Sequence, residues 1–388
     1  MSYSYLFVLG VSPELCFAEL KSVLTQFVPD HTISWHQHPL VCITFPDPPP
    51  VAELNKRLGG TVKIARSMKQ VELIDAETLL SVIPSETKNF GLSNYSQRNL
   101  PIMELCKEVK ALREPQNLRY VLPKESGILQ SIVVLKQNIT ELICFIDQNK
   151  QWGIAQTVAV QNSEDWSKRD FGRPFADPSS GMLPPKVARM MLNLVVTNKP
   201  QLILDPFCGM GTVVAEGLLL GQKMIGSDIN HEVITKARAN LTWFIQTYRL
   251  DESCYGLETG DATHVSELVP AVSIDAIVTE PFLGTAFEKQ GEVLMRNGKP
   301  VTQQNLDNTF TGLEKLYRGV LREWTKVLKP GGFVVIVLPE VSFGRSVFRV
   351  KKMIDNCEKL GYTVKQGSLQ YARPQAVVKR QIYVFRKI

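Results

Sequence analysis

Several features that mark other protein classes are missing from this 388-residue chain. Its seven cysteines are scattered and never spaced as C-x-x-C, which leaves no zinc site and fits reduced thiols in a cytoplasm. No run of 18 or more apolar residues exists, so we expect no membrane-spanning helix. The N-terminal residues lack the basic and long apolar segments of a signal peptide. We therefore expect a cytoplasmic protein without a metal or a membrane contact.

The histidines cluster, but they do not form a convincing metal site. His31, His36 and His38 lie in a Pro-flanked segment whose only nearby acid is Asp30. Structural metal sites usually add cysteine or further acidic ligands at defined spacings. We expect these histidines in a solvated loop.

Charge is modest and unevenly distributed. Charged residues make up 21% of the chain and hydrophobic residues 44%, which is ordinary for a globular protein of two or three domains. The net charge is +6, whereas residues 1–180 carry 18 basic and 19 acidic side chains. The positive excess after residue 180 is compatible with a polyanionic partner. The basic residues near the end are expected on a solvated face: Arg345, Arg349, Lys351, Lys352, Arg373, Lys379 and Arg380.

The chain is organised around residues 201–230, QLILDPFCGMGTVVAEGLLLGQKMIGSDIN. An apolar run at 202–204 predicts a buried parallel strand, and the glycines at 209 and 211 allow a sharp turn close to a ligand. A helix is predicted over 212–220 and a second strand over 224–228. Neither G-x-x-x-x-G-K-[ST] nor G-x-G-x-x-G is present, which argues against a P-loop or a dinucleotide fingerprint.

Two acids in this stretch indicate the ligand. Asp205 opens the glycine turn, where a carboxylate would repel phosphate but suits a cationic ligand that carries an amine. Asp228 ends the second strand and can accept hydrogen bonds from two ribose hydroxyls. An amine beside one acid and a ribose on the other describe S-adenosylmethionine.

Further motifs follow in an order typical of methyltransferases. Strands alternating with helices over 200–388 predict a doubly wound α/β domain with a mainly parallel sheet. G-D-A at 260–262 falls where that fold ends its third strand, with Asp261 placed to bind the adenine amino group. T-E-P-F follows at 279–282, and K-P-G-G precedes a buried strand at 333–338.

The remaining segments suggest smaller α+β units and connectors. Residues 1–80 have the order of a ferredoxin-like unit with one strand not identified, and 86–165 form a second unit in which 129–136 is expected as a strand. Residues 165–185 are expected as a polar connector leading to a helix at 186–196 that can pack across the cofactor mouth. A mobile loop is expected at 285–308 and a helix at 347–360.

The chain resembles the THUMP-containing tRNA guanosine N2-methyltransferases, which act on guanosine 10. The likeness rests on M-L-P-P-K-V-A-R-M-M-L-N-L at 182–194 with I-L-D-P-F-C-G-M-G-T at 203–212, and on R-D-F-G-R-P at 169–174. It implies a ferredoxin-like domain over 1–80, a THUMP-like RNA-binding domain over 81–165, and a Rossmann-like methyltransferase domain over 166–388 that includes a linker at 166–181. It also implies a tRNA substrate and a monomer, with room for a small activator subunit.

These motifs assign the candidate site residues. The cofactor-binding candidates are Pro185, Asp205, Pro206, Phe207, Gly209, Gly211, Thr212, Asp228, Ile229, Asp261, Ala262 and Glu280. The basic residues that flank the cofactor mouth either contact phosphates or belong to the polar connector: Arg169, Arg173, Lys186 and Arg189.

The catalytic candidates are Glu280, Pro281 and Phe282, and here the chain departs from the family. Relatives usually have D-P-P-Y-G, whereas this chain has E-P-F-L-G. The chemistry needs a carboxylate and the carbonyl of the following proline to hold the exocyclic amine, and an aromatic ring to stack on a flipped base. Glu280 is one methylene longer than aspartate, and Phe282 can supply the aromatic ring.

Three functions are compatible with these observations. The first is a tRNA guanosine N2-methyltransferase, and the second is a DNA adenine-N6 or cytosine-N4 methyltransferase, which uses a similar strand-end motif. The third is a non-catalytic RNA-binding protein that retains the cofactor fold. The N-terminal 180 residues show no recognisable DNA-reading motif, which weighs against the second.

Overall fold

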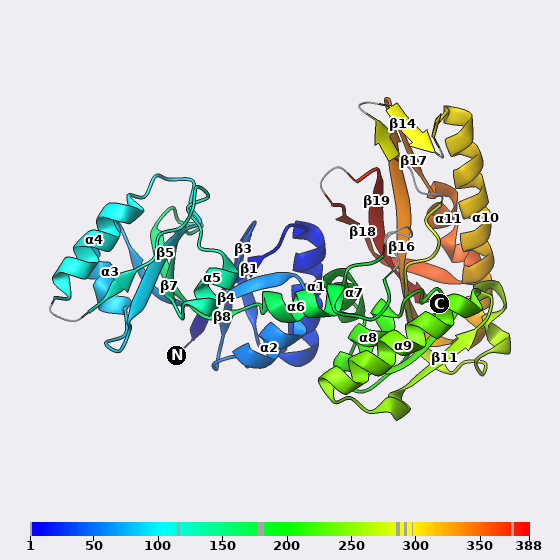
Figure 1. The fold of residues 1–388 in the computed structure, drawn as a ribbon, viewed down its shortest axis with the longest axis horizontal. Coiled ribbons are helices and arrows are strands. Elements are labelled where there is room, and N and C mark those ends of the chain that lie inside the picture. The colour runs from blue at the N-terminus through cyan, green and yellow to red at the C-terminus, as the bar shows by residue number, and fades with distance from the viewer. Residues whose placement is uncertain are drawn as a thin grey trace. The chain divides into compact units, whose positions relative to one another are not determined.

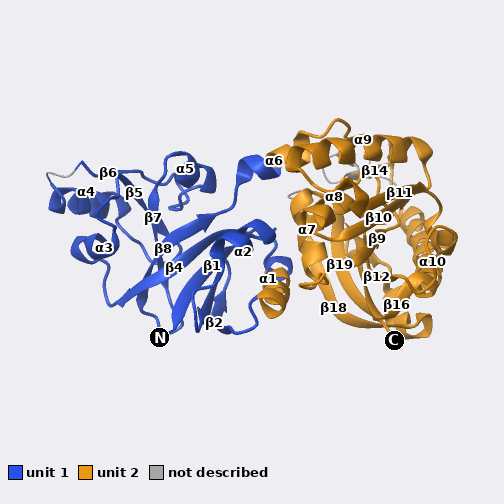
Figure 2. Cartoon of the chain, turned by 90° about the horizontal axis from the view of Figure 1, so that it is seen from below, with its two compact units in different colours: residues 1–16, 28–166 blue, residues 17–27, 167–388 orange. Residues whose placement is uncertain are grey.

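The chain folds into two compact units. A computed structural model describes residues 2–114, 117–176, 182–284, 288–290, 293–296, 298–373 and 376–388. The first unit comprises residues 1–16 and 28–166, and the second comprises 17–27 and 167–388 (Figure 2). Each unit is built around an 8-stranded sheet. No helix in the described residues is long and apolar enough to cross a membrane.

The first half of unit one has the β-α-β-β-α-β order expected of a ferredoxin-like fold. Its strands lie in the order β2-β3-β1-β4, and each neighbouring pair is antiparallel. The strand that the sequence did not reveal is β2, which carries His36, so the expectation of a loop there was wrong. Most β2 residues are exposed and polar, which hides the strand from a hydrophobicity pattern. The elements are β1 (Tyr3–Leu9), α1 (Pro13–Phe27), β2 (Thr32–Gln37), β3 (Leu40–Phe45), α2 (Val51–Arg57) and β4 (Thr61–Val71).

The second half continues the same sheet. β4 pairs with β8, and the order then runs β8-β7-β5-β6, so the expected boundary at residue 80 falls within one continuous sheet. Residues 131–136 form a helix rather than the expected strand; a short apolar run does not distinguish the two by itself. The elements are α3 (Ala76–Val82), β5 (Asn89–Asn94), α4 (Ile102–Leu112), β6 (Arg119–Tyr120), α5 (Ser131–Lys136), β7 (Thr140–Ile146) and β8 (Trp152–Val160).

A buried ion pair lies inside this shared sheet. Lys63 of β4 donates to Glu141 of β7 at 2.5 Å, and both side chains are almost completely buried. Ser93 and Thr157 also donate to the Glu141 carboxylate, and Lys63 donates to the carbonyl of Leu129. Because both charges are hydrogen-bonded on several sides, the ion pair is tolerated in the core. Removing one partner would leave the other charge buried and unpaired.

The second unit has the strand order β11-β10-β9-β12-β16-β19-β18, with β17 paired to β16. The strands from β11 to β16 are parallel, and β19 is antiparallel between β16 and β18. The order reverses between β9 and β12, and ligands of such sheets bind outside the carboxyl ends of the strands at that point. Figure 1 shows α10 running alongside β16.

The helices and strands of unit two, with helix α6 leading into it, have the following bounds. The first part contains α6 (Ser163–Phe171), α7 (Pro185–Asn193), β9 (Leu202–Asp205), α8 (Thr212–Leu219), β10 (Lys223–Asp228), α9 (His231–Tyr248), η1 (Glu252–Cys254), β11 (Tyr255–Thr259), η2 (Ala262–Glu267) and β12 (Ile274–Thr279). The second part contains β13 (Glu288–Gln290), β14 (Val293–Arg296), β15 (Lys299–Pro300), α10 (Gln303–Val327), β16 (Leu328–Phe343), β17 (Ser346–Arg349), α11 (Lys351–Asp355), η3 (Cys357–Leu360), β18 (Tyr362–Tyr371) and β19 (Val378–Lys387).

Three expectations in this unit need correction. Helix α6 occupies the start of the expected connector at 165–185, and residues 177–181 lie outside the described part. The expected loop at 285–308 contains the small sheet β13-β14-β15 and the first turns of α10, with 285–287, 291–292 and 297 outside the described part. Residues 347–360, expected as one helix, divide into the end of β17, α11 and η3. Helix α10 begins at Gln303, within the segment expected as a loop, because the side chains of Thr302 and Asn305 form a capping box at its N-terminus.

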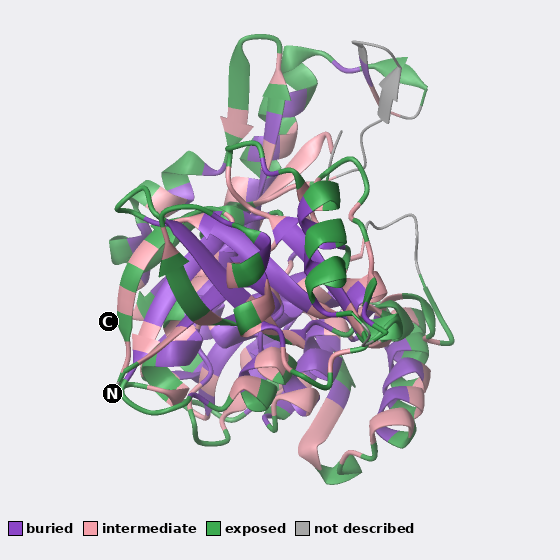
Figure 3. Cartoon of the chain, turned by 90° about the vertical axis from the view of Figure 1, so that its left-hand side faces the viewer, coloured by how far each residue is buried: buried purple, intermediate pink, exposed green. Residues whose placement is uncertain are grey.

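The core follows the sheets. Buried residues lie mainly along the strands, while exposed residues follow the loops and the outer faces of the helices (Figure 3). In unit two, α10 buries an apolar face that includes Leu313, Tyr317, Val320 and Trp324 against the sheet. This packing holds the strands rigidly, and the loops at their carboxyl ends are therefore positioned by a fixed scaffold.

Candidate active site at the strand ends

The turn after β9 forms the first wall of the site. Asp205 ends the strand and is only 2% exposed; its carboxylate accepts hydrogen bonds from the Thr279 hydroxyl at 2.7 Å and the Phe207 amide at 3.3 Å. Gly209 and Gly211 have φ of +50° and +85°, a region that favours glycine. A Cβ atom on Gly209 would meet no atom within 4 Å, so the turn borders open space.

Burial disfavours a charge on Asp205. Its pKa is raised to about 7, and desolvation is the largest cause. The hydrogen bonds from Thr279 and Phe207 oppose this rise, and the nearby carboxylates of Asp228 and Glu280 contribute to it. A cation placed beside this carboxyl would reverse the effect, since it would favour the ionised form. The charge of Asp205 would therefore depend on the charge of a group placed beside it.

Asp228 lies at the same edge of the sheet. The parallel register pairs Gly226 with Asp205, which brings the ends of β10 and β9 together. The Asp228 carboxylate accepts from the Gly209 amide at 3.3 Å and from the Asn230 amide at 3.0 Å. Two backbone donors thus fix the carboxylate against the glycine turn, while the neighbouring Ile229 is 72% exposed.

Asp261 adds a third acid after β11. Its carboxylate caps η2 by accepting from the Thr263 amide at 2.8 Å, and this hydrogen bond lowers its pKa. The next residue, Ala262, is buried. β11 pairs with β10 in parallel, so Asp261 follows a strand end at the same edge as Asp228.

Glu280 follows β12 and is held by an arginine that the sequence analysis had expected on a solvated face. Arg380 of β19 donates from Nε to Glu280 Oε1 at 2.5 Å and from Nη2 to Oε2 at 3.3 Å. The two side chains are only 13% and 15% exposed, so that expectation was wrong for Arg380. Pro281 is buried, whereas Phe282 is 58% exposed and its carbonyl accepts from the Tyr317 hydroxyl at 2.7 Å.

Two of the arginines that were expected either to contact phosphates or to lie in a polar connector are instead internal. Arg169 and Arg189 both donate to the carboxylate of Glu216 on α8, at distances between 2.7 and 2.9 Å, and all three side chains are nearly fully buried. These guanidinium groups are kept in the interior by their shared partner, which corrects the expected phosphate contact for both. The Arg173 side chain is only 6% exposed and donates to the Thr212 hydroxyl at 2.9 Å and to the Asp170 carboxylate.

The comparisons with known proteins agree with this arrangement. Residues 172–296 match the family described as "UPF0020: RMKL-like, methyltransferase domain". The chain is 27% identical to the tRNA (guanine(10)-N2)-dimethyltransferase of Pyrococcus abyssi over 73% of its own length and 78% of that protein. It is 30% identical to the "Probable tRNA (guanine(10)-N2)-dimethyltransferase" of Methanothermococcus thermolithotrophicus over 34% of its length and 90% of that protein. The chain belongs to the tRNA (guanine(10)-N2)-dimethyltransferase family.

A solved structure has the same fold as this family member. The superposition on TrmN from Thermus thermophilus covers 100% of both chains, with a TM-score of 0.58 and 15% sequence identity. The two-unit α/β architecture is therefore shared well beyond the range of sequence similarity. The resemblance to this family that the motifs indicated is confirmed, as are the α/β fold class and the Rossmann-like domain.

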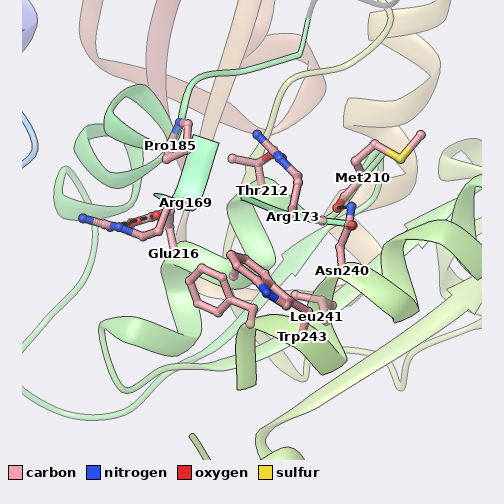
Figure 4. A pocket seen from close by; sticks show the side chains of 12 residues that line it. Arg169, Arg173, Pro185, Met210, Thr212, Glu216, Asn240, Leu241 and Trp243 are labelled. Atoms are coloured by element: carbon pink, nitrogen blue, oxygen red, sulfur yellow. Dashed lines mark hydrogen bonds and ion pairs between the residues drawn. The ribbon is translucent and has the colours of Figure 1, made fainter. Parts of the chain in front are cut away.

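A small cavity borders the glycine turn of this protein. It has a volume of about 20 Å³ and is lined by Arg173, Pro185, Thr212, Asn240 and Trp243, among others (Figure 4). That volume holds about one water molecule, so the cavity is too small for the expected ligands. The Asn240 side chain connects two segments beside the cavity. Its Oδ1 accepts from the Phe175 amide, and its Nδ2 donates to the carbonyls of Phe175 and Met210.

The structure thus brings most of the expected residues to one edge of the sheet. Asp205 and Asp228 end β9 and β10, and Asp261 and Glu280 follow β11 and β12, so all four lie at the carboxyl ends of neighbouring strands. Pro185 and Lys186 begin α7, where Pro185 is buried and Lys186 is partly exposed. The individual roles of these residues stay predictions. Arg380 is the residue that sequence reasoning missed, and its only signal was a basic side chain within an apolar strand.

Proposed function

We propose that this protein transfers a methyl group from S-adenosylmethionine to N2 of a guanosine in tRNA, with guanosine 10 as the target. One observation carries the proposal: in a chain of this family, Glu280 and Pro281 follow directly on Thr279, which is bonded to Asp205 at the mouth of the glycine turn. The candidate acceptor pair for an exocyclic amine therefore directly follows a residue that is hydrogen-bonded to the candidate cofactor turn.

The described residues suit S-adenosylmethionine. Asp228 offers a carboxylate fixed by two backbone amides for the ribose hydroxyls, and charge-assisted hydrogen bonds of this kind are strong. Asp205 would face the ammonium group, and Asp261 with Ala262 would meet the adenine. The turn also leaves open space at Gly209, where a Cβ atom would meet no atom within 4 Å.

The chemistry then depends on positioning. Guanine N2 is a poor nucleophile because its lone pair is delocalised into the ring. Glu280 and the Pro281 carbonyl would accept the two N2 hydrogens and turn the lone pair out of the ring plane, and Glu280 would stabilise the positive charge that develops on nitrogen. The bound cofactor would supply an electrophilic methyl carbon, whose bond to sulfur breaks as the bond to N2 forms. The methylated amine then loses one proton to solvent, which restores a neutral base.

Phe282 is proposed to hold the target base. The ring is 58% exposed next to Glu280, and a base flipped out of a helix is usually stacked on an aromatic side chain. Tyr317 fixes the backbone of this residue through the Phe282 carbonyl. The phenyl ring would therefore start from a defined backbone position.

The first unit is proposed to supply affinity for tRNA through a THUMP-like domain within 81–165, and the site itself lies in the proposed methyltransferase domain, 166–388. This division rests on the family resemblance. We further propose that the protein acts in the cytoplasm without a metal, which the proposed tRNA substrate and the scattered cysteines support. The family resemblance also leads us to propose a monomer. Sedimentation with and without tRNA would test the oligomeric state.

A transfer assay tests the proposed function. Methyl-labelled cofactor is incubated with bulk tRNA, with a tRNA transcript that carries guanosine or adenosine at position 10, and with duplex DNA. We expect N2-methylated guanosine in bulk tRNA and in the guanosine-10 transcript, with loss of the label in the adenosine-10 transcript. Label in DNA would support the adenine or cytosine alternative. Binding of tRNA without transfer to any RNA would support the non-catalytic alternative.

A further inference from the structure

We infer that Arg380 is a positioning residue, which holds the Glu280 carboxylate ionised and in one orientation so that it can accept the amine of the target base. This inference rests on the proposed function, and it adds a residue outside the motif that aligns with the family. The two residues lie 100 positions apart in sequence, on β19 and after β12. Strand β16 lies between these strands in the sheet, and Arg380 is paired there with Pro339.

The geometry leaves room for the substrate. An ionised carboxylate has about four acceptor positions on its two oxygens. Arg380 uses one position on each oxygen, through Nε and Nη2. The remaining positions are available for an amine hydrogen, so the pair need not break when a base binds.

The pair also restricts the Glu280 side chain. Glutamate has one more rotatable bond than aspartate, and fixing it costs conformational entropy. A guanidinium that grips both oxygens restricts that freedom, because its planar fork matches the carboxylate. A lysine at this position would keep the charge but lose the two-point contact.

Charges around Glu280 come from several elements. Arg380 of β19 and Arg373, which follows β18, favour the ionised carboxylate. The buried Asp205 at the end of β9 and Tyr317 of α10 are further titratable groups that interact with it. Desolvation raises the pKa of Glu280, and the attraction to Arg380 is the largest effect that opposes this rise. Without Arg380, Glu280 would hold a proton at higher pH and lose acceptor capacity.

The test compares Arg380→Gln, Arg380→Lys and Lys379→Gln in the full-length protein. Lys379→Gln removes the same charge from the neighbouring position of β19, where the lysine lies 3.9 Å from Glu340. For Arg380→Gln we expect kcat at pH 7 to fall about 10–100-fold and the acidic limb of the kcat profile to move up by about 1–3 pH units. Arg380→Lys should keep the limb in place with a smaller loss of kcat, and Lys379→Gln should match the wild type.

A second measurement decides the inference without methyl transfer. Carboxyl carbons of glutamate are labelled with ¹³C, the Glu280 signal is identified by its loss in Glu280→Gln, and its titration is followed by NMR in the wild type and in Arg380→Gln. We expect the midpoint to rise by about 1–3 pH units in the variant. An unchanged midpoint, or a kcat that falls equally at every pH, would overturn the inference. If the wild type transfers no methyl group, the proposed function fails, and the titration still decides the role of Arg380.

Discussion

Cofactor binding should depend on pH through Asp205. Burial raises the pKa of this carboxyl to about 7, and a bound cation would favour its ionised form, so affinity should increase as pH rises. If only the ionised form binds, the apparent Kd is weakened about 11-fold at pH 6 and about 2-fold at pH 7. Affinity should therefore rise about fivefold over this single unit, with release of up to about one proton per cofactor bound.

Calorimetry at pH 6.0, 6.5 and 7.0 in two buffers of different ionisation enthalpy measures both quantities. The window stays below the usual pKa of an α-amino group, about 7.7–8.0, so the ligand keeps its charge. Asp205→Asn should bind more weakly and lose the pH dependence.

Asp261→Asn is the matched control for this experiment. The Thr263 amide lowers the pKa of Asp261, so this carboxylate is already ionised throughout the window. Its variant should lose affinity and keep the slope with pH. A wild-type affinity that is flat from pH 6 to 7, or a slope that persists in Asp205→Asn, would refute the coupling.

Other predictions concern binding, turnover and stability. Asp228→Ala should lose about 2–4 kcal/mol of cofactor affinity in calorimetry, and unchanged affinity would remove Asp228 from the ribose site. Glu280→Gln should lower kcat about 100–1000-fold while cofactor affinity stays nearly the same; wild-type turnover would exclude Glu280 from catalysis. Glu216→Gln should lower the free energy of unfolding in urea by about 3–5 kcal/mol, because two buried arginines lose their shared carboxylate; a loss similar to that of an exposed acid such as Glu252 would contradict this. The folded-state pKa of Asp205 lies above its ordinary value, so its stabilising contribution is present at low pH and is lost as pH rises through about 7. Asp205→Asn should therefore be more stable than the wild type at pH 8, by at most about 4 kcal/mol. This difference in the free energy of unfolding should vanish near pH 3.

The sequence by itself determined the elements whose signals are local. Residues 201–230 were predicted as strand, turn, helix and strand, and β9, α8 and β10 agree to within one residue at each end. An apolar run, glycines with positive φ and a following helical segment act within a few residues of each other. The order of the acidic motifs along the chain also indicated the edge where they meet.

Only the tertiary structure decided the contacts between distant residues. Charged side chains are usually exposed, so Arg169, Arg189 and Arg380 were expected at the surface. Instead, Arg169 and Arg189 are buried and the Arg380 side chain is only 13% exposed, and each is paired with a carboxylate from another element. Residues 347–360 divide between a strand and short helices because β17 pairs with β16, a partner that local propensity does not reveal. A buried charge is tolerable only where a partner removes the cost of its desolvation, and the fold alone brings that partner within reach.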